Sequence, residues 1–287
     1  MNSMVILKFL RVKNYLKNFI ILVPIFYAEK IFNYDLIQEL FVIFVILNLS
    51  ASIVYIFNDL TDYENDINDN YKKKRPLASK EITRKNASNI LIILSVLLIS
   101  ILIFKQNFEL YIFISLYLIL NYFYSSFLKY IFFVDVLCLT SFYLIRILLV
   151  IFYFDLVISY WLISIVFFII ISVSLAKRYI DINNNINNPL FQSLYKKQLL
   201  YFMINLLFLI SLVLYIFFSL DPNTVEKFSK YFFLTSIIFM LGILRFLYML
   251  KNEKYPDVID FFFQDRKFIL ILILYVFFNF KLIYLPN

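Results

Sequence analysis

The sequence predicts an all-α integral membrane protein built as a bundle of nine transmembrane helices. Two observations carry this prediction. The 287 residues are 63% hydrophobic and only 16% charged, with a mean hydropathy of +0.85, whereas soluble domains are about half apolar and about a quarter charged. The apolar residues also gather into nine runs that are long enough to cross a hydrocarbon core of about 30 Å.

The predicted spans follow one another along the chain, separated by short hydrophilic segments. They lie at 15–33, 36–57, 87–104, 108–127, 132–154, 157–176, 198–220, 230–250 and 267–285. The first run resembles a signal peptide because cations precede it, but no small-residue cleavage site follows Tyr27, so we expect a helix there. The whole chain, 1–287, then forms one polytopic membrane domain.

The positions of the 27 Lys and Arg residues predict the orientation of the chain. With the N-terminus inside, twenty of them fall in cytoplasmic segments and five in segments on the opposite side, while Arg146 and Arg245 lie within spans. Because cytoplasmic loops retain Lys and Arg, we expect a protein of the cytoplasmic (inner) membrane with its N-terminus inside. Its two longest cytoplasmic loops are 58–86 and 177–197.

Missing residue types exclude several kinds of chemistry. The chain has no His and a single Cys, Cys138, which excludes a catalytic triad, an imidazole base, a zinc site held by His or Cys, and an intrachain disulfide. Any metal must be held by oxygen, which favours magnesium or manganese. The net charge of +8 suits contact with anionic membrane lipids. The sequence contains no basic-aromatic ribbon, so we do not expect it to bind nucleic acid.

An acidic cluster follows the second predicted span. Asp59, Asp62 and Asp66 share one face if the helix continues, with Asn58 beside them. Three neighbouring carboxylates repel one another unless a cation neutralises them, and hard oxygen ligands suit a magnesium ion that also binds a diphosphate. The alternative is a solvated acidic loop. We favour the metal site because the cluster lies at the membrane edge beside cations.

Those cations are Lys72, Lys73, Lys74 and Arg75 in the same loop. Arg75 is a candidate fork for phosphate oxygens, whereas Lys73 and Lys74 better fit a role as membrane anchors. A second cluster at the end of the sixth predicted span contains Lys177, Arg178, Tyr179 and Asp181. Lys177 and Asp181 stand four residues apart, so a plain ion pair competes evenly with an anion clamp.

Charged residues within the spans need partners. Arg146 and Arg245 each cost on the order of 3 kcal/mol at mid-bilayer, so we expect polar partners for both. Asp135 lies close to the helical face of Arg146 and is expected to line the same cavity. Near the N-terminus, membrane anchoring and a functional role compete evenly for Arg11, Lys13, Lys17 and Asn18.

The acidic run 58–66 (NDLTDYEND) resembles the first aspartate-rich motif of the UbiA superfamily, NDxxDxxxD. Its continuation 72–79 (KKKRPLAS) resembles the KxxRPxAS segment of the decaprenyl-phosphate phosphoribosyltransferase branch. Similarity to that branch continues over nearly the whole chain, at 11–18 (RVKNYLKN), 124–129 (YSSFLK), Asp135, Arg146, 177–179, 244–246 and 265–266. The chain departs from the branch at Asp69-Asn70, Lys80, Val12 and Asp181, where the branch usually has His-Pro, Gly, Pro and Glu.

This resemblance implies a UbiA-like bundle with a cytoplasm-facing central cavity, in which Asp59, Asp62 and Asp66 hold Mg2+ against a diphosphate. The implied reaction moves a 5-phosphoribosyl group from phosphoribosyl diphosphate, a phosphorylated sugar donor, to a polyprenyl phosphate lipid, a step of cell-envelope biosynthesis. The implied substrate-binding residues are Lys17, Asn18, Asn58, Lys72, Arg75, Tyr124, Lys129, Asp135, Arg146, Lys177, Arg178 and Asp181.

Two other functions remain open at the level of sequence. A UbiA-type prenyltransferase would move a polyprenyl group from its diphosphate to an aromatic or other small acceptor. Such enzymes usually carry a second aspartate-rich motif, and here the corresponding loop offers only Asp181 beside two cations. A transporter or channel would need ionisable groups or broken helices near the midplane, whereas most carboxylates of this chain lie at the cytoplasmic edge and its one Gly is Gly242. We therefore favour an enzyme with a phosphate-rich substrate.

Overall fold

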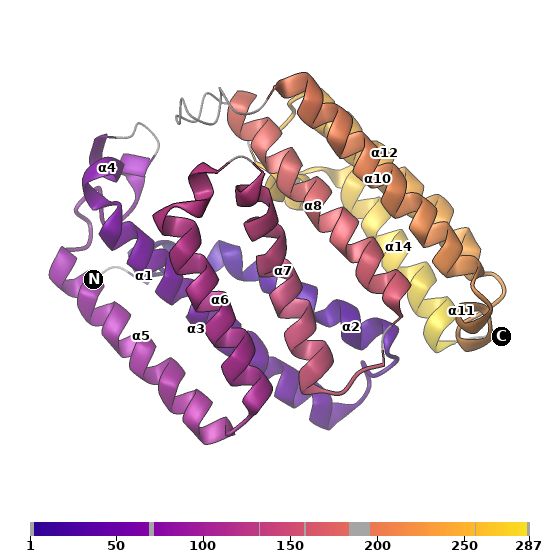
Figure 1. The fold of residues 1–287 in the computed structure, drawn as a ribbon, viewed down its shortest axis with the longest axis horizontal. Helices are drawn as coiled ribbons and strands as arrows, with labels where there is room; N and C mark the ends of the chain where they lie inside the picture. Colours follow the sequence, from indigo (N-terminus) through magenta and orange to yellow (C-terminus); the bar gives the residue numbers. More distant parts are fainter. Residues whose placement is uncertain are drawn as a thin grey trace. The chain divides into compact units, whose positions relative to one another are not determined.

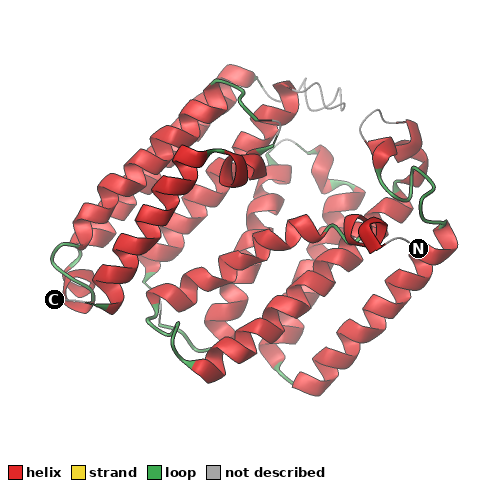
Figure 2. Cartoon of the chain, turned by 180° about the vertical axis from the view of Figure 1, so that it is seen from behind, coloured by secondary structure: helices red, strands yellow, loops and turns green. Residues whose placement is uncertain are grey.

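The computed structural model describes residues 3–68, 72–131, 133–157, 159–183, 196–255 and 257–285. Every regular element in these ranges is a helix (Figure 2). The contacts divide the chain into two compact units, which are described separately. The first unit comprises Met1–Ile131 and Ser141–Val157, and the second comprises Phe132–Thr140 and Ile158–Asn287.

Eight helices in the described residues are long and apolar enough to cross a membrane. They are α3 (Tyr34–Thr61), α5 (Arg84–Lys105), α6 (Phe108–Ser126), α7 (Val134–Tyr153), α8 (Tyr160–Asn183), α10 (Lys197–Leu220), α12 (Thr235–Lys251) with the preceding η4 (Phe232–Leu234), and α14 (Arg266–Tyr284). Each of them contains most of one predicted span. Length and hydropathy therefore located eight of the nine predicted segments.

The remaining predicted span, 15–33, is not confirmed. A ten-residue 3-10 helix, η1 (Val12–Ile21), runs through its first part and is followed by the six-residue α2 (Leu22–Tyr27). Runs of 3-10 helix longer than three or four residues are uncommon. Asn18, at the centre of this segment, is buried and hydrogen-bonded to polar side chains. Composition thus predicted an apolar segment here but not its helix type.

In the first unit, α3 packs against α5, α6 and η1. The side chains of Asn33, Thr83 and Asn107 cap the starts of α3, α5 and α6 by accepting a backbone N–H of the first turn, as good N-cap residues do. The short α1 (Ser3–Phe9) and the loop after η2 (Lys72–Lys74) are held at one end of α3 and α5 by a buried cluster of Phe9, Ile56, Leu77, Ile82 and Ala87. This packing brings the N-terminal segment and the loop to the acidic end of α3.

In the second unit, α8 packs along α10, α10 along α12, and α12 along α14 (Figure 1). The short α13 (Val258–Gln264) contacts α8 and α14, and α11 (Pro222–Lys227) follows α10. Leu175, Ile204 and Met249 are fully buried in the shared core.

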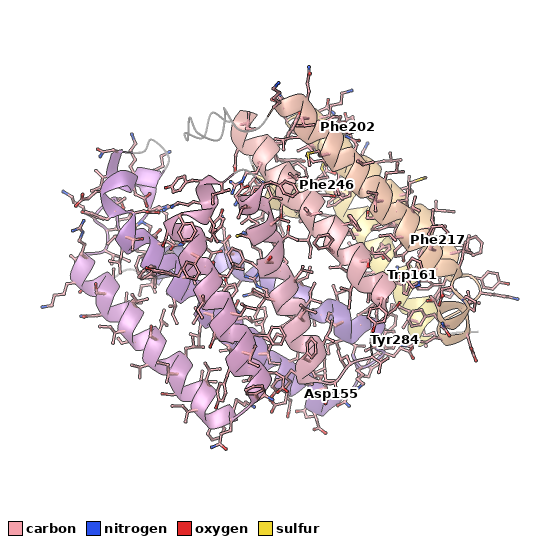
Figure 3. All side chains as sticks on the ribbon, in the orientation of Figure 1. Asp155, Trp161, Phe202, Phe217, Phe246 and Tyr284 are labelled. Atoms are coloured by element: carbon pink, nitrogen blue, oxygen red, sulfur yellow. The ribbon has the colours of Figure 1, made fainter. Side chains whose placement is uncertain are left out.

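Aromatic side chains of the second unit differ in their surroundings. Trp161 and Phe217 lie side by side at one end of α8 and α10, with ring centroids 6.1 Å apart, whereas Phe202 on α10 is 63% exposed (Figure 3). Such exposed apolar side chains suit a lipid environment better than water.

Candidate functional site

The acidic cluster of the first unit is organised around Arg75. Its Nη1 lies 3.1 Å from Asp59 Oδ1 and 2.6 Å from Asp66 Oδ2, and both carboxylate side chains are only 2% exposed. Asp59 lies in the last turn of α3, and Asp66 lies in α4 (Tyr63–Asn68), which restarts the helix one residue after α3 ends. Seven residues are about two helical turns, so the two carboxylates come to the same side and share one nitrogen.

A second guanidinium reaches Asp59 from the N-terminal segment. Arg11 Nη2 donates to Asp59 Oδ1, and the Arg11 guanidinium lies 4.7 Å from the centre of the Tyr55 ring. Arg11 stands between α1 and η1 in the left-handed conformation, with φ 54°. The sequence could not assign this contact because 48 residues separate the two side chains, and its only signal was the family-like run 11–18. Lys17 is half-buried on η1.

The remaining predicted residues of the first unit come from several elements. Lys129, in η3 (Leu128–Tyr130), places its Nζ 3.6 Å from Asp62 Oδ2. Asn58 is half-buried, and its carbonyl oxygen accepts the backbone N–H of Asp62 at 2.9 Å. Tyr124 is half-buried, with its ring centroid 5.6 Å from that of Phe142. The side chain of Lys72 lies outside the part of the chain that the structure describes, as do Asp69 and Asn70.

The oxygen ligands of this cluster suit a metal only in company with a substrate. Within the described residues, no three Asp, Glu or Cys side chains form a group that could hold a metal ion by themselves. Mg2+, however, is usually bound by one or two carboxylates plus substrate phosphates and waters. Asp59 and Asp66 supply two hard oxygen ligands that already meet at one cation. The residues therefore fit a magnesium ion that arrives with a phosphorylated substrate.

Arg146 lies in a buried network of the first unit. It is 5% exposed, its Nε donates to Asn18 Oδ1 at 2.6 Å, its Nη2 donates to the Tyr117 hydroxyl at 3.2 Å, and its Nη1 donates to a carbonyl oxygen of its own helix. Asn18 Nδ2 in turn donates to Asn48 Oδ1 at 2.6 Å. The expected polar partners are thus present. Asn18 lies in this network, and Asp135 lies in the second unit with a different partner.

In the second unit, Arg178 is held between two carboxylates. Its Nε lies 2.6 Å from Asp135 Oδ2, and its Nη1 lies 3.0 Å from Asp181 Oδ2. Asp135 is completely buried, while the Asp181 side chain is 27% exposed. Lys177 is half-buried on the preceding position of α8. Asp181 therefore pairs with Arg178, three residues before it. The spacing of four residues had made Lys177 the expected ion-pair partner of Asp181.

The structure also supplies the partner that was expected for Arg245. Arg245 donates to both oxygens of Asp265, at 3.0 and 2.6 Å, and Lys254 Nζ lies 2.8 Å from Asp265 Oδ2. Asp265 also caps α14 by accepting the backbone N–H of Phe268 at 2.8 Å. The Arg245 hydrogen bonds, followed by those of Lys254 and Phe268, hold the pKa of Asp265 well below its ordinary value, although burial opposes them.

Comparisons with known proteins identify the fold. Over 97% of this chain and 99% of the other, the structure resembles that of a UbiA homolog from Archaeoglobus fulgidus bound to GPP and Mg2+, with a TM-score of 0.67 and 15% sequence identity. The same homolog bound to DMAPP and Mg2+ gives a TM-score of 0.66. A structure from work on digeranylgeranylglyceryl phosphate synthase in membranes gives 0.60, with 18% identity and 98% of each chain covered.

A search of curated protein sequences gives no match. The UbiA prenyltransferase family, in contrast, matches residues 19–278, which is most of the chain. Together with the long apolar helices, this match makes the chain an integral membrane protein. The protein belongs to the UbiA prenyltransferase family.

Proposed function

We propose that this protein is a magnesium-dependent transferase that moves a 5-phosphoribosyl group from phosphoribosyl diphosphate to a polyprenyl phosphate in the membrane. The observation that carries the proposal is the meeting of Asp59 and Asp66 at Arg75, with Arg11 on the same Asp59 oxygen. Carboxylates paired with guanidinium groups in this way place metal ligands, the carboxylate oxygens, beside donors for phosphate oxygens, the guanidinium N–H groups. Such a site suits a diphosphate leaving group.

Different residues of this site would bind the metal ion and the phosphate groups. Asp59 and Asp66, with Asp62 as the third ligand that the family resemblance implies, would hold Mg2+ together with substrate phosphates, and the ion would supply charge neutralisation for the departing diphosphate. Arg75 would contact phosphate oxygens through its planar fork, and Lys72 and Lys129 would contact them as point charges. Fixed donors around the leaving group stabilise the charge that develops on it.

The transfer itself needs no protein base. The bond between the anomeric carbon and the diphosphate oxygen breaks, and a bond between that carbon and an oxygen of the acceptor phosphate forms. The acceptor phosphate is already anionic, so no proton has to be removed before it attacks. This agrees with a chain that contains no His.

Residues of the second unit would bind a further phosphate group. Lys177 and Arg178 are the cations for this role, and the two carboxylates on Arg178 would fix the orientation of its guanidinium group. Lys17, Asn18, Asn58, Tyr124 and Arg146 would contact substrate through their polar groups. The cytoplasm-facing cavity, the inside position of the N-terminus, the inner-membrane location and a role in cell-envelope biosynthesis belong to the same proposal.

A second candidate function is transfer of a prenyl group from its diphosphate to an aromatic or other small acceptor. It is favoured by the family and by the similar structures, which are described as bound to GPP or DMAPP together with Mg2+. The site at Asp59 and Asp66 would serve either donor, because both donors leave as diphosphate. The identity of the donor therefore separates the two functions.

The test is product formation by the purified protein in detergent with Mg2+. One reaction contains radiolabelled phosphoribosyl diphosphate and a polyprenyl phosphate, and a second contains a polyprenyl diphosphate and an aromatic acceptor. We expect a lipid-linked radiolabelled product in the first reaction that Asp59→Asn abolishes. If only the second reaction gives product, and that product depends on Asp59, the protein is a prenyltransferase and the proposal of phosphoribosyl transfer is wrong.

A further inference from the structure

The charges around Asp59 balance without any metal ion. Asp59 and Asp66 are both buried and bring two negative charges, while Arg11 and Arg75 bring two positive charges. A divalent cation that entered this neutral group alone would leave an uncompensated excess of positive charge in a partly buried site, which is unfavourable. If a divalent cation entered together with a diphosphate, the diphosphate would supply the compensating negative charge. It would also give the guanidinium groups a new anion to bind.

We propose that Arg11 is a placeholder cation, which neutralises Asp59 while no metal is bound and moves to the diphosphate when Mg2+ and diphosphate bind together. The inference rests on the proposed function, since it assumes that Asp59 is a metal ligand. It assigns Arg11 a part in the order of binding: Arg11 disfavours metal alone and favours metal with diphosphate. The two ligands would therefore bind cooperatively.

Arg11 is better suited to this exchange than Arg75. Arg75 binds two carboxylates and lies in a loop whose backbone is fixed by bonds from Ser79 N to Arg75 O, at 2.8 Å, and from Ile82 N to Pro76 O, at 3.0 Å. Arg11 bonds to Asp59 alone among the carboxylates of the described residues. Its guanidinium also lies over the Tyr55 ring, and this cation–π contact would keep it near the site after it leaves the carboxylate.

The side chain of Arg11 can move while its backbone stays in place. The backbone N–H of Arg11 donates to Lys8 O at 3.2 Å, and its carbonyl oxygen accepts from Asn14 N at 2.8 Å. These two bonds hold the left-handed junction between α1 and η1. Arg11→Gln keeps a non-glycine residue at this junction, so the backbone preference changes little, and the substitution removes the guanidinium.

The test measures binding of Mg2+ and of inorganic pyrophosphate by calorimetry, each alone and both together, to the full-length protein in detergent. We expect Arg11→Gln to raise the affinity for Mg2+ alone and to lower the affinity for pyrophosphate in the presence of Mg2+, each by about fivefold or more, a typical size for coupling between two ligands. Arg11→Lys keeps the charge and should keep the wild-type affinity for Mg2+ alone.

Arg84→Gln is the matched control. Arg84, the first residue of α5, lies over the Tyr63 ring and 3.7 Å from Glu64. Its removal lowers the charge beside the acidic segment by one and leaves the ion pairs of Asp59 and Asp66 in place. This variant should leave both affinities within about twofold of wild type. If Arg11→Gln behaves like Arg84→Gln, or lowers both affinities together, the placeholder role is wrong.

An Asp59→Asn variant separates this inference from the proposed function. If Asp59→Asn abolishes Mg2+ binding while Arg11→Gln changes nothing, Asp59 remains a metal ligand and only the role of Arg11 is overturned. If Mg2+ and pyrophosphate bind to Asp59→Asn as they do to wild type, the proposed metal site is itself wrong, and the inference about Arg11 is overturned with it.

Discussion

Asp135 Oδ2 lies 2.6 Å from Nε of Arg178, and this ion pair joins the first turn of α7 to the last turns of α8. Asp135 is completely buried, and the Arg178 side chain is only 10% exposed. A charge removed from water in this way depends on its partner. Removing one partner alone would therefore destabilise the fold whether or not Arg178 also binds substrate.

Arg178→Gln should lower the free energy of unfolding by about 3–5 kcal/mol, because it leaves the Asp135 carboxylate buried without its cation. The measurement is reversible unfolding in mixed detergent micelles. Asp181→Asn should cost less than about 1 kcal/mol, since the Asp181 side chain is 27% exposed. If the double variant Asp135→Asn/Arg178→Gln recovers most of the lost free energy, the ion pair is supported. Equal losses in Arg178→Gln and Asp181→Asn would contradict it.

Asn18→Leu tests the buried network of Arg146. It removes the acceptor of Arg146 Nε and the donor to Asn48, and hydrogen bonds to charged groups contribute about 1.5–3 kcal/mol each. We expect a loss of about that size in the same unfolding assay. Lys13→Gln, an exposed change on the same 3-10 helix, should have little effect. If the two variants unfold alike, the network does not stabilise η1.

Arg75→Lys keeps the positive charge of the site but loses the planar fork. A Lys ammonium is a point charge that does not reproduce bidentate binding, so we expect the KM for the diphosphate donor to rise about tenfold, with a smaller change in kcat. The measurement is initial rate against donor concentration. A variant with an unchanged KM would show that Arg75 only neutralises Asp59 and Asp66.

The sequence predicted the spanning helices because their determinants are local. Residues 84–105 form one helix because Thr83 caps its start and an unbroken apolar run follows, and both features are visible in the sequence. The segment 15–33 was predicted as a span by the same criteria. In its 3-10 helix, Asn18 is buried against Asn48 and Arg146. These partners lie far away in the chain, so hydropathy could not show the contacts.

The candidate site was predictable in part. Asp59, Asp66 and Arg75 all fall in the segment 58–86. Helical spacing grouped the two aspartates with Asp62, and Arg75 follows them in the same segment. The contact between Arg11 and Asp59 spans 48 residues, and that between Arg178 and Asp135 spans 43. Such pairs depend on how helices pack, which spacing along one helix does not determine. For the same reason Asp135 was associated with Arg146 on its own helix, whereas its partner comes from α8.

Asp265 predicts a specific response to pH. Its depressed pKa means that its ionised form stabilises the fold at every pH above its ordinary value and that this contribution is lost only as the pH falls towards the depressed pKa. The melting-temperature difference between wild type and Asp265→Asn should therefore be constant from about pH 8 to pH 5 and shrink below about pH 4. A difference that already shrinks between pH 7 and pH 5 would contradict this assignment.

Asp59 and Asp66 are the residues that we propose to hold the metal and diphosphate of the donor. The most direct test is the initial rate of lipid-linked product formation, with saturating Mg2+, for Asp59→Asn, Asp66→Asn and the control Glu64→Gln, whose side chain is 88% exposed. We predict a loss of about 100-fold or more for each aspartate variant and a change within about twofold for the control. Turnover at the wild-type rate in both aspartate variants would contradict the claim.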